Sequence, residues 1–195
     1  MNSRDKILEA VKSSQPDQRP LPQLQFESYN TTDAPTAFAN VLGTIGGATH
    51  FVNSYDEIEE IICAEYTHAK RIITVCSQIK TGEVISSDID PHSLEDVDLA
   101  IIEAHFGVAE NAALWVTDAL VPERVLPFIT QQLAVIVKKE DILFTMHQAY
   151  ERIGNMDYGF ATFIAGPSKT ADIEQSLVLG AHGPKTMRVF ILLNA

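Results

Sequence analysis

The residues most suited to chemistry lie between Gly166 and Lys185, where hydroxyl, ammonium and imidazole groups stand among glycines and prolines. A Gly-Pro turn is followed by Ser-Lys-Thr, and free backbone N–H groups at such a turn can hold a carboxylate or a phosphate. Lysine side chains beside them would add the positive charge that favours an anion. We therefore predict an anion-binding site made of Ser168, Lys169, Thr170 and Lys185.

His182 lies within Gly180-Ala-His-Gly-Pro184, a sequence that favours a sharp, rigid loop. An imidazole held in this way suits general acid–base chemistry near neutral pH, and we predict a catalytic role for it. The alternative is a structural histidine that donates to a backbone carbonyl. The residues alone leave both interpretations open.

Glu103, His105 and Glu110 form a third polar group around Gly107. They come from adjacent strand or loop positions, so we expect that they could converge. A glutamate at a strand end can act as nucleophile or base, and we predict that Glu110 is catalytic. The alternative is a set of ordinary polar residues at a strand end. Their spacing matches no metal-binding motif, so no metal ligand is predicted.

The chain is acidic, because its 195 residues include 14 Lys and Arg against 26 Asp and Glu, for a formal net charge of −12. Nucleic-acid binding needs clustered cations, and adjacent basic residues occur only at 70–71 and 138–139. We therefore expect neither nucleic acid nor an anionic membrane as a partner. A small carboxylate or phosphate-bearing ligand remains compatible with a local basic pocket.

No stretch reaches the ~20 apolar residues of a membrane span, and the first 14 residues lack the apolar core of a signal peptide. We expect no membrane span and a cytoplasmic location. Cys63 and Cys76 belong to no CxxC pair and are interpreted as reduced, buried thiols. Iron–sulfur clusters usually need about four thiolates, so we expect no cofactor held by this chain.

The beginning of the chain differs in pattern from the rest. Residues 3–13 predict a short helix with one apolar face, and a proline-rich, extended linker follows to residue 30. We therefore divide the chain into an N-terminal helix and arm, 1–30, and an α/β domain, 31–195. The arm is predicted to pack on the domain or on a partner subunit, and a homo-oligomer is compatible with this arrangement.

From Asp33 onward, predicted helices and strands alternate. Elements of these lengths in this order predict a largely parallel sheet covered by helices. Consecutive strands without a long helix between them predict a small antiparallel insertion. The predicted helices are 33–45, 54–66, 141–153 and 170–179. The predicted strands are 49–52, 71–76, 97–104, one or two within 107–117, 133–137, 160–165 and 187–193.

The predicted strand 160–165 and helix 170–179 would flank Ser168. The turn between them would then form a helix N-terminus, where free backbone N–H groups favour an anion. It would also lie at the carboxyl edge of the parallel sheet, where ligands of such sheets usually bind. Because most capped helices bind nothing, a purely structural cap remains the alternative.

A longer run carries a resemblance to a known family. It is Gly166-Pro-Ser-Lys-Thr-Ala-Asp-Ile-Glu-Gln-Ser-Leu-Val-Leu-Gly-Ala-His-Gly-Pro184. This run strongly resembles the signature of the LUD-domain family, lactate utilization protein C type, roughly GPSRTADIE…LVLGVHGP. The resemblance implies a three-layer α/β/α sandwich of the NagB/RpiA/CoA-transferase type. It also implies a part in oxidising L-lactate to pyruvate with iron–sulfur partner proteins, this chain being the subunit without a cluster.

The sequence departs from that family at one turn, where the usual Ala-Glu-Thr-Gly-Thr is Ala109-Glu-Asn-Ala-Ala113. Glu110 is kept, and in the wider fold a similar Glu-Asn element carries the CoA-transferase nucleophile. Two alternatives to the lactate role therefore stay open. One is a transferase or isomerase of CoA esters or sugar phosphates that uses Glu110, and the other is a non-catalytic assembly or regulatory module. No GxGxxG, GxxxxGK[ST] or GxSxG pattern occurs, so nucleotide-binding and nucleophile-elbow interpretations have no support.

Overall fold

The chain divides into two units, with the boundary in the sequence between residues 30 and 31. The computed structural model describes residues 2–17, 19–20, 33–85, 89–171 and 177–194. The first unit contains helix α1 (Ser3–Ser13), which opens with a reciprocal pair of capping hydrogen bonds between Asn2 and Asp5. No residue of α1 is buried, and its apolar side chains stay exposed. Local hydrogen bonds therefore support the start of this helix.

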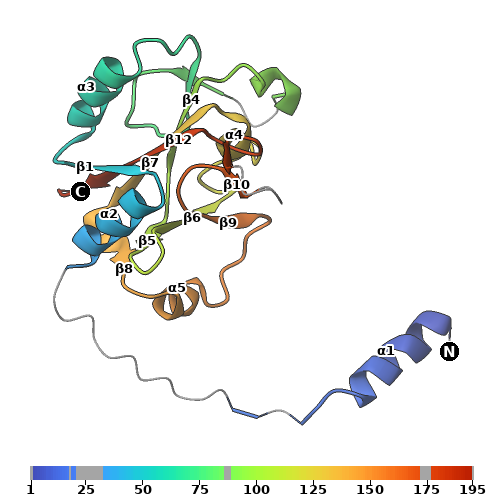
Figure 1. Cartoon of the computed structure of the whole chain (residues 1–195). Coiled ribbons are helices and arrows are strands. Elements are labelled where there is room, and N and C mark those ends of the chain that lie inside the picture. Colours follow the sequence, from blue (N-terminus) through green and yellow to red (C-terminus); the bar gives the residue numbers. More distant parts are fainter. Residues whose placement is uncertain (1, 18, 21–32, 86–88, 172–176, 195) are drawn as a thin grey trace. The chain divides into compact units, whose positions relative to one another are not determined.

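The centre of the second unit is a six-stranded sheet, and each of its strand pairings is parallel. The strands follow the order β1-β12-β7-β4-β2-β3 (Figure 1). Val, Ile and Leu dominate the inner strands because both faces of the sheet are covered. In chain order the strands are β1 (Ala48–Val52), β2 (Ile72–Thr74), β3 (Glu83–Val84), β4 (Leu99–Glu103), β7 (Gln132–Lys138) and β12 (Thr186–Leu192).

Side chains on the two faces of this sheet enter two separate cores. In β4, Leu99 and Ile101 pack with α3 (Tyr55–Glu65), whereas the residues that alternate with them pack with α2 (Ala34–Thr44). This is the period of two that a strand imposes on its side chains. The sheet is therefore the middle layer of an α/β sandwich, as predicted, with α3 on one face and α2 on the other.

A second, four-stranded sheet lies beside α2, in the order β8-β5-β6-β9 (Figure 1). Its β5–β8 pairing is parallel and its other pairings are antiparallel, so the predicted small insertion is present as a mixed sheet. On its far face Phe106 and Trp115 pack against Ala149 and Ile153 of α5. The elements are β5 (Phe106–Val108), β6 (Ala113–Thr117), β8 (Ile142–Leu143), α5 (Met146–Ile153) and β9 (Ala161–Ile164), with connecting turns η1 (Pro91–Leu94), α4 (Leu126–Ile129) and η2 (Lys139–Asp141).

The prediction of a helix over 170–179 is wrong. Lys169–Ala171 forms β10 and Leu177–Leu179 forms β11, and the two strands pair antiparallel. The ladder continues beyond them, because the Gly180 N–H donates to the Ser168 carbonyl at 3.1 Å. A Leu-Val-Leu run favours a strand, and Gly180 ends it at a φ of 77°, which glycine adopts without strain. The residues between the two strands lie outside the described part of the chain.

Candidate functional site

The residues predicted to bind an anion lie on two turns that are held against each other. The Ser168 N–H donates to the Pro184 carbonyl at 2.8 Å. Gly183 lies beside the same serine, since a Cβ on that glycine would be 3.2 Å from the Ser168 Cβ. The Lys185 N–H donates to the Gln131 carbonyl at 2.8 Å and fixes the second turn to the start of β7. The structure thus brings Ser168 together with the Gly180–Pro184 loop that carries His182.

This pair of turns lies at the amino edge of the large sheet, so the prediction of the carboxyl edge is wrong. Lys185 directly precedes β12, and its partner Gln131 directly precedes β7. The reason is that β9, the strand before Ser168, pairs with β6 in the second sheet instead of joining the parallel one. No helix begins at Ser168 either. The turn therefore has neither a helix N-terminus nor a position at the carboxyl edge to favour an anion. The charges of Lys169 and Lys185 remain.

Lys169 extends over the carboxyl end of α2. Its Nζ atom would be 3.3 Å from a Cβ on Gly46, which follows the end of that helix. An ammonium group at a helix carboxyl end is favourable because the last carbonyls point toward it. Lys169, His182 and Lys185 are all exposed, and the side chain of Thr170 lies outside the described residues. The anion-binding and catalytic roles of these residues stay predictions.

Glu110 lies in the turn between β5 and β6, where it holds the start of helix α5. Its Oε2 atom accepts from the Met146 N–H at 2.8 Å, and its own N–H donates to the Phe144 carbonyl at 3.0 Å. Within the described residues no hydrogen bond or ion pair joins Glu110 to the Ser168 turn. Glu110 therefore has a structural role as a helix cap, and its catalytic role stays a prediction.

The next residues of this turn have an unusual backbone. Asn111 Oδ1 accepts from the Ala113 N–H at 3.1 Å, which closes a local side-chain turn. Ala112 is fully buried and has a φ of 55°, in the left-handed region that glycine adopts most easily. The departure from the family sequence at this position thus places a methyl group where the backbone favours glycine.

The expected convergence of Glu103, His105 and Glu110 is not found. Glu103 is at the carboxyl edge of the large sheet, where its Oε1 accepts from the Tyr55 hydroxyl at 3.3 Å. Burial, and then Glu103, raise the pKa of Tyr55 to about 12. Burial also raises the pKa of the Cys76 thiol to about 11, with Glu103 adding to the effect. This edge therefore holds a tyrosine and a thiol that keep their protons at neutral pH, an arrangement that the sequence did not reveal.

His105 faces the second sheet instead. Its Nε2 atom lies 2.8 Å from the Thr117 hydroxyl, on the neighbouring strand β6. Burial lowers the pKa of His105, and the positive charge of Arg152 lowers it further. The neutral imidazole is therefore the form that the fold favours. The three residues predicted to converge serve three separate parts of the structure.

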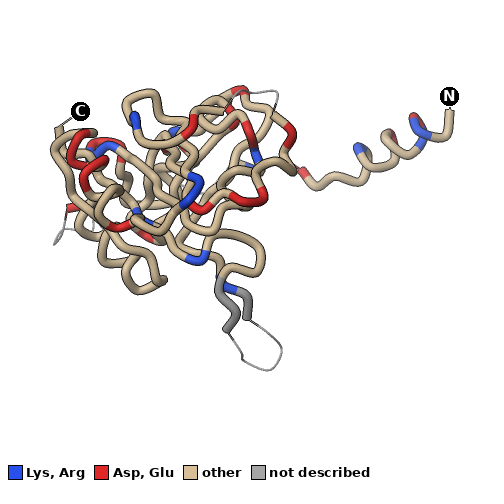
Figure 2. The backbone as a smooth tube through the Cα atoms, turned by 90° about the horizontal axis from the view of Figure 1, so that it is seen from above, with Lys and Arg blue, Asp and Glu red and all other residues tan. Residues whose placement is uncertain are grey.

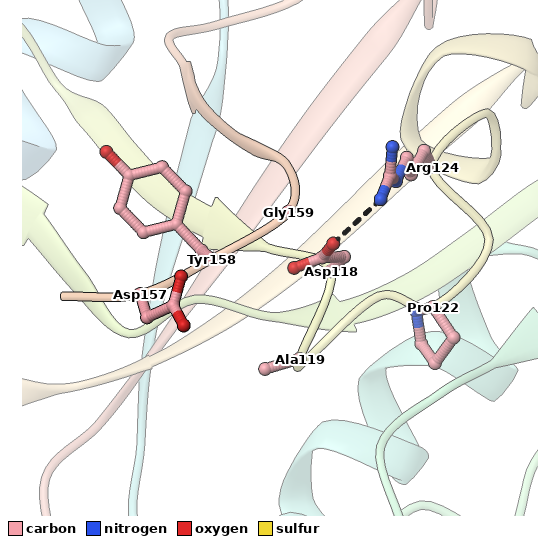
Figure 3. Close-up of a pocket in the computed structure, with 7 residues that line it drawn as sticks. All are labelled: Asp118, Ala119, Pro122, Arg124, Asp157, Tyr158 and Gly159. Atoms are coloured by element: carbon pink, nitrogen blue, oxygen red, sulfur yellow. Dashed lines mark hydrogen bonds and ion pairs between the residues drawn. The ribbon is translucent and has the colours of Figure 1, made fainter.

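An open hollow of about 480 Å³ lies at the end of the second sheet where β6 stops and the segment before β9 arrives (Figure 3). Asp118 and Arg124 form an ion pair within it, with Arg124 Nη2 donating to Asp118 Oδ2 at 3.0 Å. The sequence did not point to this place, because its two segments are about 40 residues apart and meet only through the β6–β9 pairing. Its main polar lining residues are Asp118, Arg124, Asp157 and Tyr158.

The charges of the described residues are dispersed. Figure 2 shows Lys and Arg at separate places among Asp and Glu, without a continuous basic face on the described tube. No group of three or more His, Cys, Asp or Glu side chains in the described part could hold a metal ion. Cys76 is buried as predicted, whereas Cys63 is exposed, so that prediction is wrong for Cys63. Within the described ranges, no helix has the length and apolar character that crossing a membrane requires.

The sequence and fold define this chain as a member of the LUD domain family, whose sequence model matches residues 21–192. It is 28% identical over 106 residues to lactate utilization protein C of Bacillus pumilus (strain SAFR-032). That alignment covers 51% of this chain and 44% of the Bacillus protein, so the chain matches less than half of that relative's length. It is also 25% identical over 164 residues to the uncharacterized protein YkgG of Escherichia coli (strain K12), covering 81% of this chain and 68% of YkgG.

A solved structure supports the fold independently. The crystal structure of a DUF162 family protein from Deinococcus radiodurans superposes with a TM-score of 0.63. The superposition covers 82% of this chain and 96% of that one, at 15% sequence identity. The α/β sandwich is therefore shared, and at this identity the likeness concerns the fold alone.

Proposed function

We propose that this chain is a component of a lactate-utilization system. The observation that carries the proposal is the LUD domain match over residues 21–192, together with a relative named lactate utilization protein C. The Gly166–Pro184 segment adds support, because its two turns form one hydrogen-bonded unit rather than an irregular loop.

In its finer form, the proposal is that the system oxidises L-lactate to pyruvate and passes two electrons to iron–sulfur partner proteins. This chain would be the subunit that holds no cluster. In support, the chain has two cysteines, fewer than the four thiolates that a cluster usually needs. One of them, Cys76, is a buried thiol with a raised pKa. The exposed Lys169, His182 and Lys185 would attract a small anion toward the amino edge of the sheet.

Deletion of the gene in its source organism tests the proposal. We expect growth on L-lactate as the sole carbon source to be lost, and growth on pyruvate and on glucose to be kept. Pyruvate is the informative control, because it enters metabolism after the proposed step. Restored growth on L-lactate with a plasmid-borne copy would complete the test. Normal growth of the deletion strain on L-lactate would contradict the proposal.

The transferase alternative depends on Glu110 as nucleophile or base. The carboxylate of Glu110 already accepts from the Met146 N–H, which gives this residue a reason to be present without catalysis. A Glu110→Gln variant keeps an acceptor for that N–H but cannot act as nucleophile or base. Lactate growth that survives this substitution would support the structural role, and turnover of a CoA ester or sugar phosphate that disappears with it would favour the alternative.

A further inference from the structure

The hollow beside Asp118 presents an arginine, Arg124, that is held by two contacts. Its Nη2 donates to Asp118 Oδ2 at 3.0 Å, and its guanidinium carbon lies 5.6 Å from the centroid of the Phe160 ring. The Arg124 side chain is nevertheless 56% exposed. A guanidinium carries five N–H donors in a planar fork. Asp118 is its hydrogen-bond partner among the described residues, so the N–H groups of Nε and Nη1 and the second N–H of Nη2 remain for a ligand.

Hydrogen-bond acceptors stand next to these donors. Asp118 is anchored at the end of β6, where its N–H donates to the Phe160 carbonyl at 3.0 Å. Only its Oδ2 atom is used by Arg124, which leaves Oδ1 as an acceptor. Figure 3 shows the Asp118 carboxylate with the Arg124 guanidinium on one side and Asp157 and Tyr158 on the other. The hollow therefore combines a directed pair of donors with a carboxylate acceptor beside them.

The Asp118–Arg124 ion pair packs closely against the backbone at Gly159. A Cβ at this position would be 2.8 Å from Asp118 Oδ2 and 3.0 Å from Arg124 Nη2. Gly159 is not among the glycines with a left-handed φ, so its backbone does not itself require glycine. The absence of a side chain is instead what lets the Asp118–Arg124 pair lie directly against the chain. A single methyl group here would push the pair apart without reaching the core.

We propose that this hollow binds a short carboxylate that carries a hydrogen-bond donor on its α-carbon, a 2-hydroxy or 2-amino acid. The ligand carboxylate accepts two parallel hydrogen bonds along the edge of the Arg124 guanidinium that Asp118 leaves open, from the second N–H of Nη2 and from the neighbouring N–H of Nε or Nη1, the geometry that guanidinium groups favour. The α-hydroxyl or α-ammonium group donates to the free oxygen of Asp118. Asp157, an exposed carboxylate on the opposite wall, is a second acceptor for the same donor.

The charge balance predicts what the hollow selects. Asp118 and Arg124 neutralise each other and Asp157 adds a negative charge, so the hollow does not attract anions by net charge. Binding therefore depends on matching both the carboxylate and the α-donor. Pyruvate and acetate, which lack the donor, are expected to bind more weakly than L-lactate or L-alanine. The choice of L-lactate as the first ligand rests on the proposed function, whereas the complementarity of the hollow does not.

The single tryptophan provides a direct readout. Trp115 is 6% exposed and its ring centroid lies 5.6 Å from that of Tyr158, which lines the hollow. A ligand that contacts Tyr158 is expected to change the tryptophan emission. The full chain would be titrated with L-lactate, L-alanine, pyruvate and acetate, and saturation-transfer NMR on the ligand methyl groups would confirm binding independently. We expect saturable responses to L-lactate, L-alanine or both, at least 5-fold weaker for pyruvate and acetate.

Two variants locate the ligand. Gly159→Ala moves only the flexible ends of Asp118 and Arg124, so the fold is expected to persist and the affinity to fall at least 10-fold. Gly43→Ala is the matched control, because a Cβ at Gly43 meets no atom within 4 Å. The double variant Lys169→Gln, Lys185→Gln tests the competing site at the amino edge.

Ligand binding by these variants distinguishes a site in the hollow from a site at the amino edge of the large sheet. Loss of binding in Gly159→Ala with binding kept in the control and in the lysine variant supports the hollow. Unchanged binding in Gly159→Ala, loss in the lysine variant, or no saturable response to L-lactate or L-alanine overturns it. Binding of L-alanine alone supports the hollow but removes L-lactate as its ligand. Growth on L-lactate that requires the gene, without lactate binding at the hollow, would leave the proposed function standing and this inference rejected.

Discussion

Gly166 lies directly against Ile45 at the carboxyl end of helix α2. A Cβ on Gly166 would be 3.0 Å from Ile45 Cδ1 and 3.3 Å from the Ile45 carbonyl oxygen, and the φ of Gly166 is 70°. The turn before Ser168 therefore requires glycine for two reasons, the left-handed backbone and the close approach of the helix end. This contact joins the signature segment to the helix that covers the large sheet.

Gly166→Ala is expected to lower the free energy of unfolding by about 2 kcal/mol, because it adds left-handed strain and crowding together. Gly43→Ala, within α2, is expected to raise it by about 0.5–1 kcal/mol, because alanine favours a helix and the site has room. Urea unfolding followed by circular dichroism measures both changes. Equal effects of the two substitutions would show that the Gly166–Ile45 contact is not formed.

The two cysteines are expected to differ in reactivity. Cys63 is exposed on α3, whereas Cys76 is buried and its pKa is raised to about 11. At pH 8 an aromatic disulfide reagent should therefore modify one thiol per chain rapidly and the second only after denaturant is added. The fast reaction should disappear in Cys63→Ser and persist in Cys76→Ser. Rapid modification of both thiols in the native chain would contradict the burial of Cys76.

His105 is expected to make the fold sensitive to acid. Because its pKa is lowered in the folded chain, the unfolded chain binds the proton first as the pH falls below about 6.5. Stability should therefore be lost from about pH 6.5 downward, until the folded imidazole is also protonated. His105→Gln keeps a polar partner for Thr117 without this titration, so its stability should fall less between pH 7.5 and pH 5. Urea midpoints at the two pH values measure the difference, and equal losses in both proteins would rule out His105 as the cause.

Local sequence patterns predicted the helices that are anchored by capping and apolar faces. Ser54 accepts from the Glu57 N–H at 3.2 Å and so caps the helix predicted over 54–66, and the Glu57 carboxylate accepts from the Asn53 N–H. Helix α5 begins only after Thr145, which forms a capping box with Gln148, so the predicted start at 141 is too early. Helix starts that depend on such local hydrogen bonds can be predicted from the sequence to within a few residues, because both partners are close along the chain.

The wrong prediction that Ser168 lies at the carboxyl edge of the large sheet has a different cause. Nothing in residues 160–165 distinguishes a strand of the parallel sheet from one that pairs with β6, because pairing partners are set by tertiary packing. The same pairing decides whether Ser168 lies at the carboxyl or the amino edge, and it also creates the Asp118–Gly159 hollow. The sequence thus identified the family segment and the α/β layers, while the placement of the site depended on one long-range strand pair.

L-lactate-dependent pyruvate formation in extracts of the source organism tests the proposed role in lactate utilization most directly. Extract from the gene-deletion strain is expected to form pyruvate from L-lactate at least 10-fold more slowly than wild-type extract. Adding the purified chain should restore the rate, whereas adding the same amount of Gly159→Ala should restore it less at L-lactate concentrations below saturation. An undiminished rate in the deletion extract would contradict the proposed role in lactate utilization.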